Sequence, residues 1–296
     1  MSLFPRRVAI REVGPRDGLQ AEDPVSIDSR VALIDALSAT GLRTIEAVSF
    51  VSEKAVPAMA GAADVLQRIT RAEGIAYVAL VPNLRGAQAA MEAQLDGLTV
   101  TVSASETYSQ KNTKRSIAES IEAVGDICEF VDGRLPIDVV VSCSFGSPYE
   151  GDIAPEVIGA LAREIWDTGA TALTLADTTG MATPRRVDDV LDEVGTDVGL
   201  HLHETRGTAL VNAYAALERG VARFDTSVGG LGGSPFAAGA AGNLATEDLV
   251  HVLDDLRIET GVDLAALLSI DATLAELIGH PVASNVARAG PRHAVV

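Results

Sequence analysis

Two short segments of the sequence contain residue types that could bind a metal ion together. In His201-Leu202-His203 the two histidines are two positions apart, so on a β-strand both imidazoles would point to the same side. Arg16 and Asp17 lie in a segment with two glycines and a proline, which predicts a tight turn. One carboxylate and two imidazoles suit a divalent cation such as Mg²⁺ or Mn²⁺. The alternatives are a surface turn with an exposed ion pair and histidines packed at a rim.

A glycine-rich segment precedes a third candidate ligand. Residues 229–233 contain four glycines, and Ser234 follows them. Such a segment could be a mobile lid over the site, a phosphate cradle or a permissive turn. Asn243 could supply a carbonyl oxygen to a metal ion, or it could cap the helix that follows.

Two further carboxylates follow apolar runs. Glu46 and Asp177 could each orient a metal ligand or hold Arg16, and the alternative for both is a cap on the next helical turn. Cys143 is expected to be a small buried hydrophobe.

These candidates lie at or near the ends of short runs rich in β-branched residues. Helical patterns separate the runs, and this alternation indicates parallel strands joined by helices. Eight such units are the number that closes a TIM (β/α)8 barrel, in which active sites lie at the C-terminal ends of the strands. The eight predicted strands are Val8–Val13, Thr44–Ser49, Ala76–Val81, Leu98–Ser103, Ile137–Ser142, Thr171–Leu175, Val198–His203 and Arg223–Val228.

The helical patterns connect these strands. The first is expected to begin after Ser26 as its N-cap and to stop before Gly41. Two more patterns beyond about residue 244 predict the last barrel helix and a C-terminal extension, all within one domain spanning residues 1–296. The other predicted helices are Ala55–Thr70, Arg85–Ala93, Ser116–Val131, Ala154–Trp166, Pro184–Val194 and Gly207–Arg219.

Composition excludes several classes of partner. The chain has 41 acidic and 23 basic residues, a net charge of -18, so it should repel nucleic acid and anionic membranes. No apolar run approaches the roughly 20 residues of a membrane span, and the N-terminus lacks the apolar stretch of a signal peptide. Two cysteines give no disulfide framework. A cytoplasmic protein is expected.

Several motifs together resemble the 3-hydroxy-3-methylglutaryl-CoA lyase family, one of the DRE-TIM metallolyases. The resemblance runs in order from about residue 8 to residue 288. It implies cleavage of 3-hydroxy-3-methylglutaryl-CoA to acetyl-CoA and acetoacetate with a divalent cation, Mg²⁺ or Mn²⁺, and a homo-oligomer, with a dimer as the expected form. The motifs are Glu12–Gln20, Ile45–Ser52, Val81–Leu84, Ser147–Gly151 and Gly242–Val250.

The resemblance also implies roles for individual residues. Asp17, His201, His203 and Asn243 would hold the cation, Arg16 would stabilise an enolate, and Glu46 and Asp177 would support the site. The expected partner is an acyl-CoA, and Lys111 and Arg115 are candidates for contact with its phosphates by charge and position.

The chain departs from this family at Ser234, where its members usually carry a catalytic cysteine. A hydroxyl is a much weaker acid than a thiol, whose pKa is about 8.5, so proton transfer is in question. Alternatives are therefore a related 3-hydroxyacyl-CoA substrate such as citramalyl-CoA or a longer-branched glutaryl-CoA, and a catalytically silent metal-binding protein. A Claisen-type condensing enzyme is a further alternative, because related synthases also resemble the Arg-Asp-Gly and His-x-His features.

Overall fold

A computed structural model describes residues 4–233 and 242–292 and shows a closed barrel of eight parallel strands. The strands follow one another around the barrel in chain order, and β8 closes it by pairing with β1. The predicted TIM barrel is confirmed. The strands are β1 (Ala9–Glu12), β2 (Thr44–Ser49), β3 (Ala76–Leu80), β4 (Gly97–Ser103), β5 (Ile137–Ser142), β6 (Ala172–Ala176), β7 (Gly199–His201) and β8 (Arg223–Thr226).

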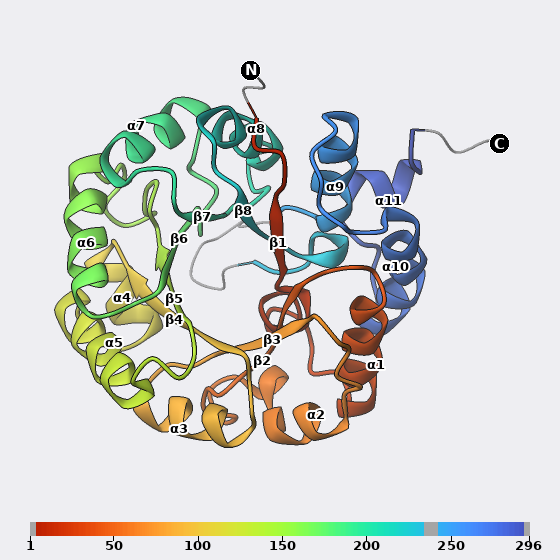
Figure 1. Cartoon of the computed structure of the whole chain (residues 1–296), viewed down its shortest axis with the longest axis horizontal. Coiled ribbons are helices and arrows are strands. Elements are labelled where there is room, and N and C mark those ends of the chain that lie inside the picture. The colour runs from red at the N-terminus through yellow and green to blue at the C-terminus, as the bar shows by residue number, and fades with distance from the viewer. Residues whose placement is uncertain (1–3, 234–241, 293–296) are drawn as a thin grey trace.

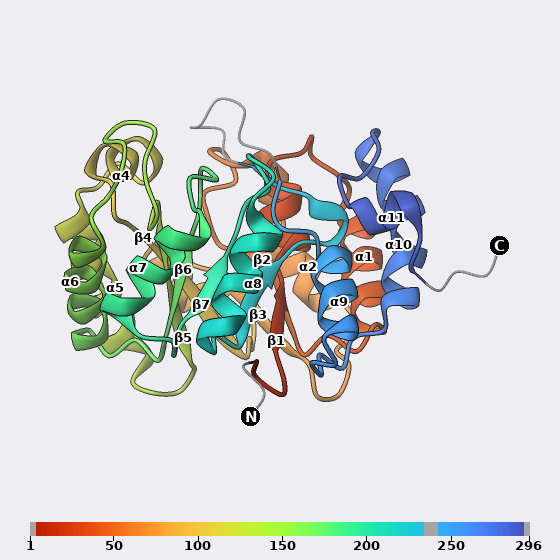
Figure 2. The ribbon, with the colours of Figure 1, turned by 90° about the horizontal axis from the view of Figure 1, so that it is seen from above.

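Helices surround the strands, and the C-terminal ones extend the ring on one side (Figure 1). In the side view α10 and α11 lie beyond α1 and α9, so the C-terminal extension packs on the outside of the barrel (Figure 2). The helices are α1 (Ile27–Ser38), α2 (Ala62–Arg68), α3 (Leu84–Glu92), α4 (Glu106–Asn112), α5 (Ile117–Val131), α6 (Pro155–Asp167), α7 (Pro184–Val194), α8 (Ala209–Arg219), α9 (Thr246–Asp255), α10 (Leu264–Ile278) and α11 (Asn285–Ala289).

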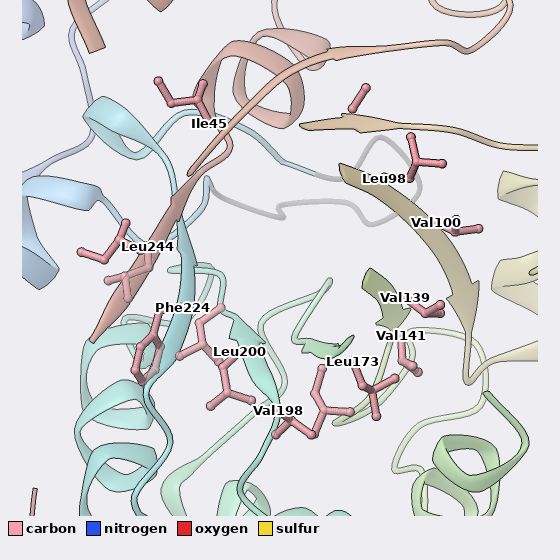
Figure 3. Close-up of a cluster of buried hydrophobic side chains, with 14 of the residues drawn as sticks. Ile45, Leu98, Val100, Val139, Val141, Leu173, Val198, Leu200, Phe224 and Leu244 are labelled. Atoms are coloured by element: carbon pink, nitrogen blue, oxygen red, sulfur yellow. The ribbon is translucent and has the colours of Figure 1, made fainter. Parts of the chain in front are cut away.

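Apolar side chains of adjacent strands form the core (Figure 3). Val139 and Val141 of β5 pack beside Leu98 of β4 and Leu173 of β6, and all four are at most 2% exposed. Parallel strands are covered by helices, so they read as nearly continuous apolar runs. This core fixes the strand ends on which the site is built.

The predicted helices match the structure except around α2 and beyond residue 244. Ser26 caps α1 by accepting a hydrogen bond from the N–H of Ser29, as expected. The helix predicted over Ala55–Thr70 is shorter, because Pro57 begins a separate 3-10 turn and α2 starts only after Gly61. Three helices follow residue 244 instead of two, and the sequence analysis missed the short α4.

Strand β7 is shorter than predicted, and this changes the setting of His203. The strand ends at His201, and His203 instead forms an isolated antiparallel bridge with Asn243. The chain therefore leaves the barrel between the two histidines and is held against the segment that returns from the glycine-rich loop.

No helix of the described ranges is long and apolar enough to cross a membrane. Cys128 and Cys143 are both free thiols.

Candidate metal centre and active site

Asp17, His201 and His203 converge at one end of the barrel. Their possible ligand atoms all lie within 4.8 Å of one another. Nε2 of His201 is 3.1 Å from Nε2 of His203 and 3.8 Å from Oδ2 of Asp17. Both histidines are buried, with exposed fractions of 7% and 3%. This arrangement of one carboxylate and two imidazoles fits a divalent metal ion.

The turn after β1 places Arg16 and Asp17. Residues Gly14–Gly18 form a single wide helical turn, in which the N–H groups of Arg16, Asp17 and Gly18 all donate to the carbonyl of Val13. A side chain at position 14 would meet Oε1 of Glu12 at 2.6 Å, so glycine is needed for this close approach. The turn that the sequence suggested is therefore packed inside the molecule and is not a surface loop.

Asn243 lies beside Asp17, and the contacts of its amide bear on its two predicted roles, as a metal ligand or as a helix cap. Its Nδ2 donates to Oδ2 of Asp17 and to the carbonyl of Leu231, both at 2.8 Å. The helix that follows has Ala245 at its N-cap and no side-chain cap, so the capping role is wrong. Oδ1 of Asn243 is buried without a hydrogen-bond partner in the part of the chain that the structure describes. A buried carbonyl oxygen of this kind is costly unless a donor or a cation reaches it.

Arg16 is held between two carboxylates. Its Nε donates to Oε2 of Glu46 at 2.5 Å, Nη2 pairs with the same carboxylate, and Nη1 donates to Oδ1 of Asp17 at 2.6 Å. Burial alone would lower the pKa of Arg16, but the charges of Glu46 and Asp17 raise it, so the guanidinium stays protonated. For Asp17 burial acts in the opposite direction and would raise the pKa. The charges of Arg16 and His201 outweigh burial, so the pKa of Asp17 lies below its ordinary value.

Asp177 organises the loop after β6. Its Oδ1 accepts from the N–H groups of Met181 and Ala182 at 2.7 and 3.0 Å. Helix α7 is capped by Thr183, so Asp177 caps the loop before that helix and not the helix itself. Burial raises the pKa of Asp177 to about 7. The hydrogen bonds of the Asp177 side chain link it to this loop, whereas Glu46 is the carboxylate that holds Arg16.

A cavity of about 510 Å³ begins at this group and extends toward α4. Arg16, Asp17, His201 and His203 line one part of it. Basic residues line another part: Arg115, whose expected contact with CoA phosphates stays a prediction, and Lys114, which was not among the candidates. Lys111 lies off this wall, and its ammonium is 4.6 Å from the centre of the Tyr149 ring. Apolar residues complete the wall, among them Val51, Val56, Leu80, Val100 and Val140.

Two residues close to the site escaped the sequence analysis. Asp225 of β8 lies 3.3 Å from Nδ1 of His201, and it pairs with Arg11 of β1 inside the barrel. The available signal was a charged residue inside a predicted barrel strand, because such a residue needs a buried partner. Ser234, the remaining predicted site residue, lies outside the described residues.

Comparison with known proteins shows similarity along nearly the whole chain. A model of the HMGL-like family matches residues 7–274. A Pseudomonas aeruginosa protein named 3-hydroxy-3-isohexenylglutaryl-CoA/hydroxy-methylglutaryl-CoA lyase is 42% identical over 293 residues, covering 97% of this chain and 98% of its own. The hydroxymethylglutaryl-CoA lyase of Bacillus subtilis is 41% identical over 289 residues, covering 95% of this chain and 97% of its own.

The fold is similar to solved lyase structures as well. An HMG-CoA lyase from Acinetobacter baumannii, solved in complex with coenzyme A and 3-methylmalate, matches with a TM-score of 0.94 and 41% identity. The match covers 100% of this chain and 99% of that one. The family resemblance expected from the motifs is confirmed.

Proposed function

This chain belongs to the HMGL-like family and is a carbon–carbon lyase, and we propose that it cleaves 3-hydroxy-3-methylglutaryl-CoA to acetyl-CoA and acetoacetate with Mg²⁺ or Mn²⁺. The observation that carries the proposal is the group of half-buried Asp17 and buried His201 and His203 on the wall of a cavity that Arg16 also lines. The names of the P. aeruginosa and B. subtilis relatives support this substrate, and the complex of the A. baumannii lyase supports a CoA ligand.

Asp17, His201, His203 and Asn243 would hold the cation. The buried Oδ1 of Asn243 supports this set, because a carbonyl oxygen is a ligand that hard cations such as Mg²⁺ prefer. When bound, the cation would act as a Lewis acid that makes the tertiary 3-hydroxyl of the substrate easier to deprotonate.

Arg16 would stabilise the negative charge that forms as the C2–C3 bond breaks. The 3-hydroxyl loses its proton, C3 becomes the ketone of acetoacetate, and the electron pair of the broken bond forms the enolate of acetyl-CoA. A proton then adds at C2, so the reaction needs no further reactant. Arg16 is 8% exposed, and its Glu46 and Asp17 contacts fix the guanidinium before substrate arrives, which is how a preorganised cation lowers a barrier.

Binding of the CoA portion would use the basic end of the cavity. Lys114 and Arg115 line the wall there, and Arg115 is oriented by donating to the carbonyl of Pro82 at 3.0 Å. Lys111 lies beside Tyr149 and is a weaker candidate for phosphate contact. A local cation pair of this kind can bind phosphate even in a chain with a net charge of -18.

The test is product analysis by mass spectrometry. Purified protein is incubated with 3-hydroxy-3-methylglutaryl-CoA and either Mg²⁺, Mn²⁺ or a chelator. We expect metal-dependent acetyl-CoA and acetoacetate from the wild type and none from Asp17→Ala or His201→Ala. His251→Ala is the matched control, because His251 lies on α9 away from the site, and it should retain wild-type turnover.

Each result bears on a different part of the proposal. Full activity of Asp17→Ala or His201→Ala would contradict the metal-site assignment. Equal turnover with chelator would contradict metal dependence. Silence of the wild type on every substrate, with Mn²⁺ binding retained, would favour a metal-binding protein without this activity.

A related substrate with a longer 3-alkyl branch is the second candidate. The P. aeruginosa relative carries isohexenylglutaryl-CoA in its name, and the cavity wall here is rich in apolar side chains. The replacement of the usual loop cysteine by Ser234 also favours testing other 3-hydroxyacyl-CoA esters. The panel therefore includes citramalyl-CoA and a 3-isohexenyl ester, and preferential turnover of either would reassign the substrate while keeping the mechanism. Condensation of the products in the reverse assay would identify a Claisen-type enzyme.

A further inference from the structure

Asp225 connects the proposed metal site to an ion pair inside the barrel. In the sheet Asp225 of β8 is paired in register with His201 of β7 on one side and with Arg11 of β1 on the other. Its Oδ2 lies 3.3 Å from Nδ1 of His201. Barrel closure therefore places one carboxylate between a candidate metal ligand and a guanidinium.

Arg11 fixes this carboxylate with two parallel bonds. Its Nε donates to Oδ1 of Asp225 at 2.8 Å and its Nη2 to Oδ2 at 2.6 Å. The third nitrogen, Nη1, donates to Oδ2 of Asp138 at 2.7 Å on the opposite side of the barrel interior. Such fork-to-fork pairing sets both the position and the plane of the carboxylate.

The same pairing keeps Asp225 ionised. Oδ1 and Oδ2 each accept a hydrogen bond from the Arg11 guanidinium, and a charge-assisted pair of this kind favours the ionised carboxylate. An ionised carboxylate can only accept hydrogen bonds. Nδ1 of His201 must then be the donor.

We propose that Asp225 is a positioning residue that holds His201 in the Nδ1–H tautomer, so that the lone pair on Nε2 faces Asp17 and His203. A neutral imidazole has one donor and one acceptor nitrogen, so fixing the proton on Nδ1 leaves Nε2 as the ligand atom. Carboxylates that orient metal-binding histidines in this way raise both the geometric precision and the basicity of the ligand. The inference rests on the metal site of the proposed function.

The first experiment tests the tautomer in the metal-free wild type. Long-range ¹H–¹⁵N NMR at pH 9 distinguishes the two tautomers of a neutral imidazole. The chain has five histidines, and His201→Ala assigns the signal of His201. We expect the Nδ1–H form for His201, and a dominant Nε2–H form would overturn the proposal. This measurement needs neither turnover nor bound metal.

The second experiment measures Mn²⁺ affinity by calorimetry. Asp225→Asn removes the charge and puts an amide beside Nδ1 of His201. Either the oxygen or the nitrogen of that amide can face Nδ1, so the tautomer is no longer fixed and we expect the Mn²⁺ Kd to rise about 10- to 100-fold. The NMR signal of His201 should shift toward a mixture of tautomers in the same variant. Asp138→Asn is the matched control, because Asp138 contacts Arg11 but not His201. Its Mn²⁺ Kd should stay within about threefold of wild type, since only the residue that touches the ligand should matter.

The variants separate the two proposals. Loss of Mn²⁺ binding in His201→Ala together with an unchanged Kd in Asp225→Asn would overturn the role of Asp225 and leave the metal site intact. Retention of Mn²⁺ binding in His201→Ala would overturn the metal site itself. If Asp225→Asn does not fold, the tautomer of His201 in the wild type decides the question.

Discussion

Arg11 and Glu12 are adjacent in β1, yet they belong to two buried acidic regions with opposite protonation behaviour. Arg11 points into the barrel, where it pairs with Asp138 and Asp225. Glu12 faces the other side, as neighbouring residues of a strand do. It accepts hydrogen bonds from the N–H groups of Gly14 and Val228 and from the hydroxyl of Thr246.

The carboxylates respond differently to the same degree of burial. Burial raises the pKa of Glu12 to about 7, because its described partners are backbone N–H groups and a hydroxyl, and these only partly offset the cost. Nearby, burial raises the pKa of Asp271 to about 6 and that of Glu247 well above its ordinary value. Asp225, also buried, has its pKa lowered by Arg11.

The difference shows that a guanidinium, and not burial, decides which acids are charged here. Asp225 and Asp17, whose pKa values are lowered, lie at the barrel interior and the proposed metal site, next to Arg11 and Arg16. Glu12, Glu247 and Asp271, whose pKa values are raised, lie behind the turn that begins the glycine-rich loop, where Glu247 accepts from the N–H of Gly229. The acids beside Arg11 and Arg16 supply fixed charge to the site, and Glu12 and Glu247 hold the turns that support it.

Removing the guanidinium of Arg11 from the barrel interior should have the largest effect on stability. Arg11→Met would leave Asp225 and Asp138 buried without their partner, so we expect a loss of about 3–5 kcal/mol in the free energy of unfolding, measured with urea. Arg68→Met is the control, since Arg68 and Asp28 form an ion pair of exposed side chains. It should cost about 1 kcal/mol or less. An equal effect of both variants would contradict the comparison.

Arg16→Gln tests the cation at the active site. The variant removes the charge proposed to stabilise the enolate, so kcat should fall by about 10²- to 10³-fold with the protein still folded. Arg16→Lys keeps a charge but cannot form the fork with Glu46, and it should recover only part of the activity. Steady-state kinetics with near-saturating Mg²⁺ measure both variants, and wild-type kcat in Arg16→Gln would refute the role.

The raised pKa of Glu12 predicts that stability depends on pH. An acid whose pKa rises from 4.5 unfolded to about 7 folded binds its proton more tightly when folded, so its stabilisation is present below pH 4.5 and is lost as pH rises through 7. Glu12→Gln keeps the polar contacts without the titration. Between pH 5 and pH 8 the free energy of unfolding of the wild type should therefore fall by about 3 kcal/mol more than that of Glu12→Gln.

Urea unfolding at several pH values checks this prediction. The exposed Glu73→Gln is the control and should reproduce the wild-type profile. Identical profiles for Glu12→Gln and the wild type would show that Glu12 keeps its charge in the folded protein.

The smallest expected effect comes from one hydroxyl. Thr246→Val removes the donor to Oε2 of Glu12, leaving a buried oxygen unpaired, which should cost about 1–3 kcal/mol at pH 7. Thr168→Val, which loses a bond to a carbonyl near the end of α6, should cost less than about 0.5 kcal/mol because the position is partly exposed to water. Thermal unfolding compares the two.

Much of the fold and of the candidate site could be predicted from local patterns. The eight strands were predicted within two residues at every boundary, because apolar runs and helical spacing are local properties of the chain. Barrel closure then implied that Asp17 and His201 would meet, since both follow strand ends. The helix predicted over Ala55–Thr70 begins too early, because Pro57 starts a separate 3-10 turn and only Ala62–Arg68 is α-helical.

The sequence by itself determined the strand order, the barrel and the residue types available for a metal ion. Only the tertiary structure decided that Arg11 reaches Asp225, 214 residues away, and that Asn243 presents its amide to Asp17 and does not cap α9. It also decided that, within residues 4–233 and 242–292, Glu12 is met by backbone N–H groups and a hydroxyl and not by a cation. These features depend on side chains that meet across strands and loops distant in the chain. A local pattern shows that a charge will be buried, but the packed barrel selects its partner, and the partner sets its protonation.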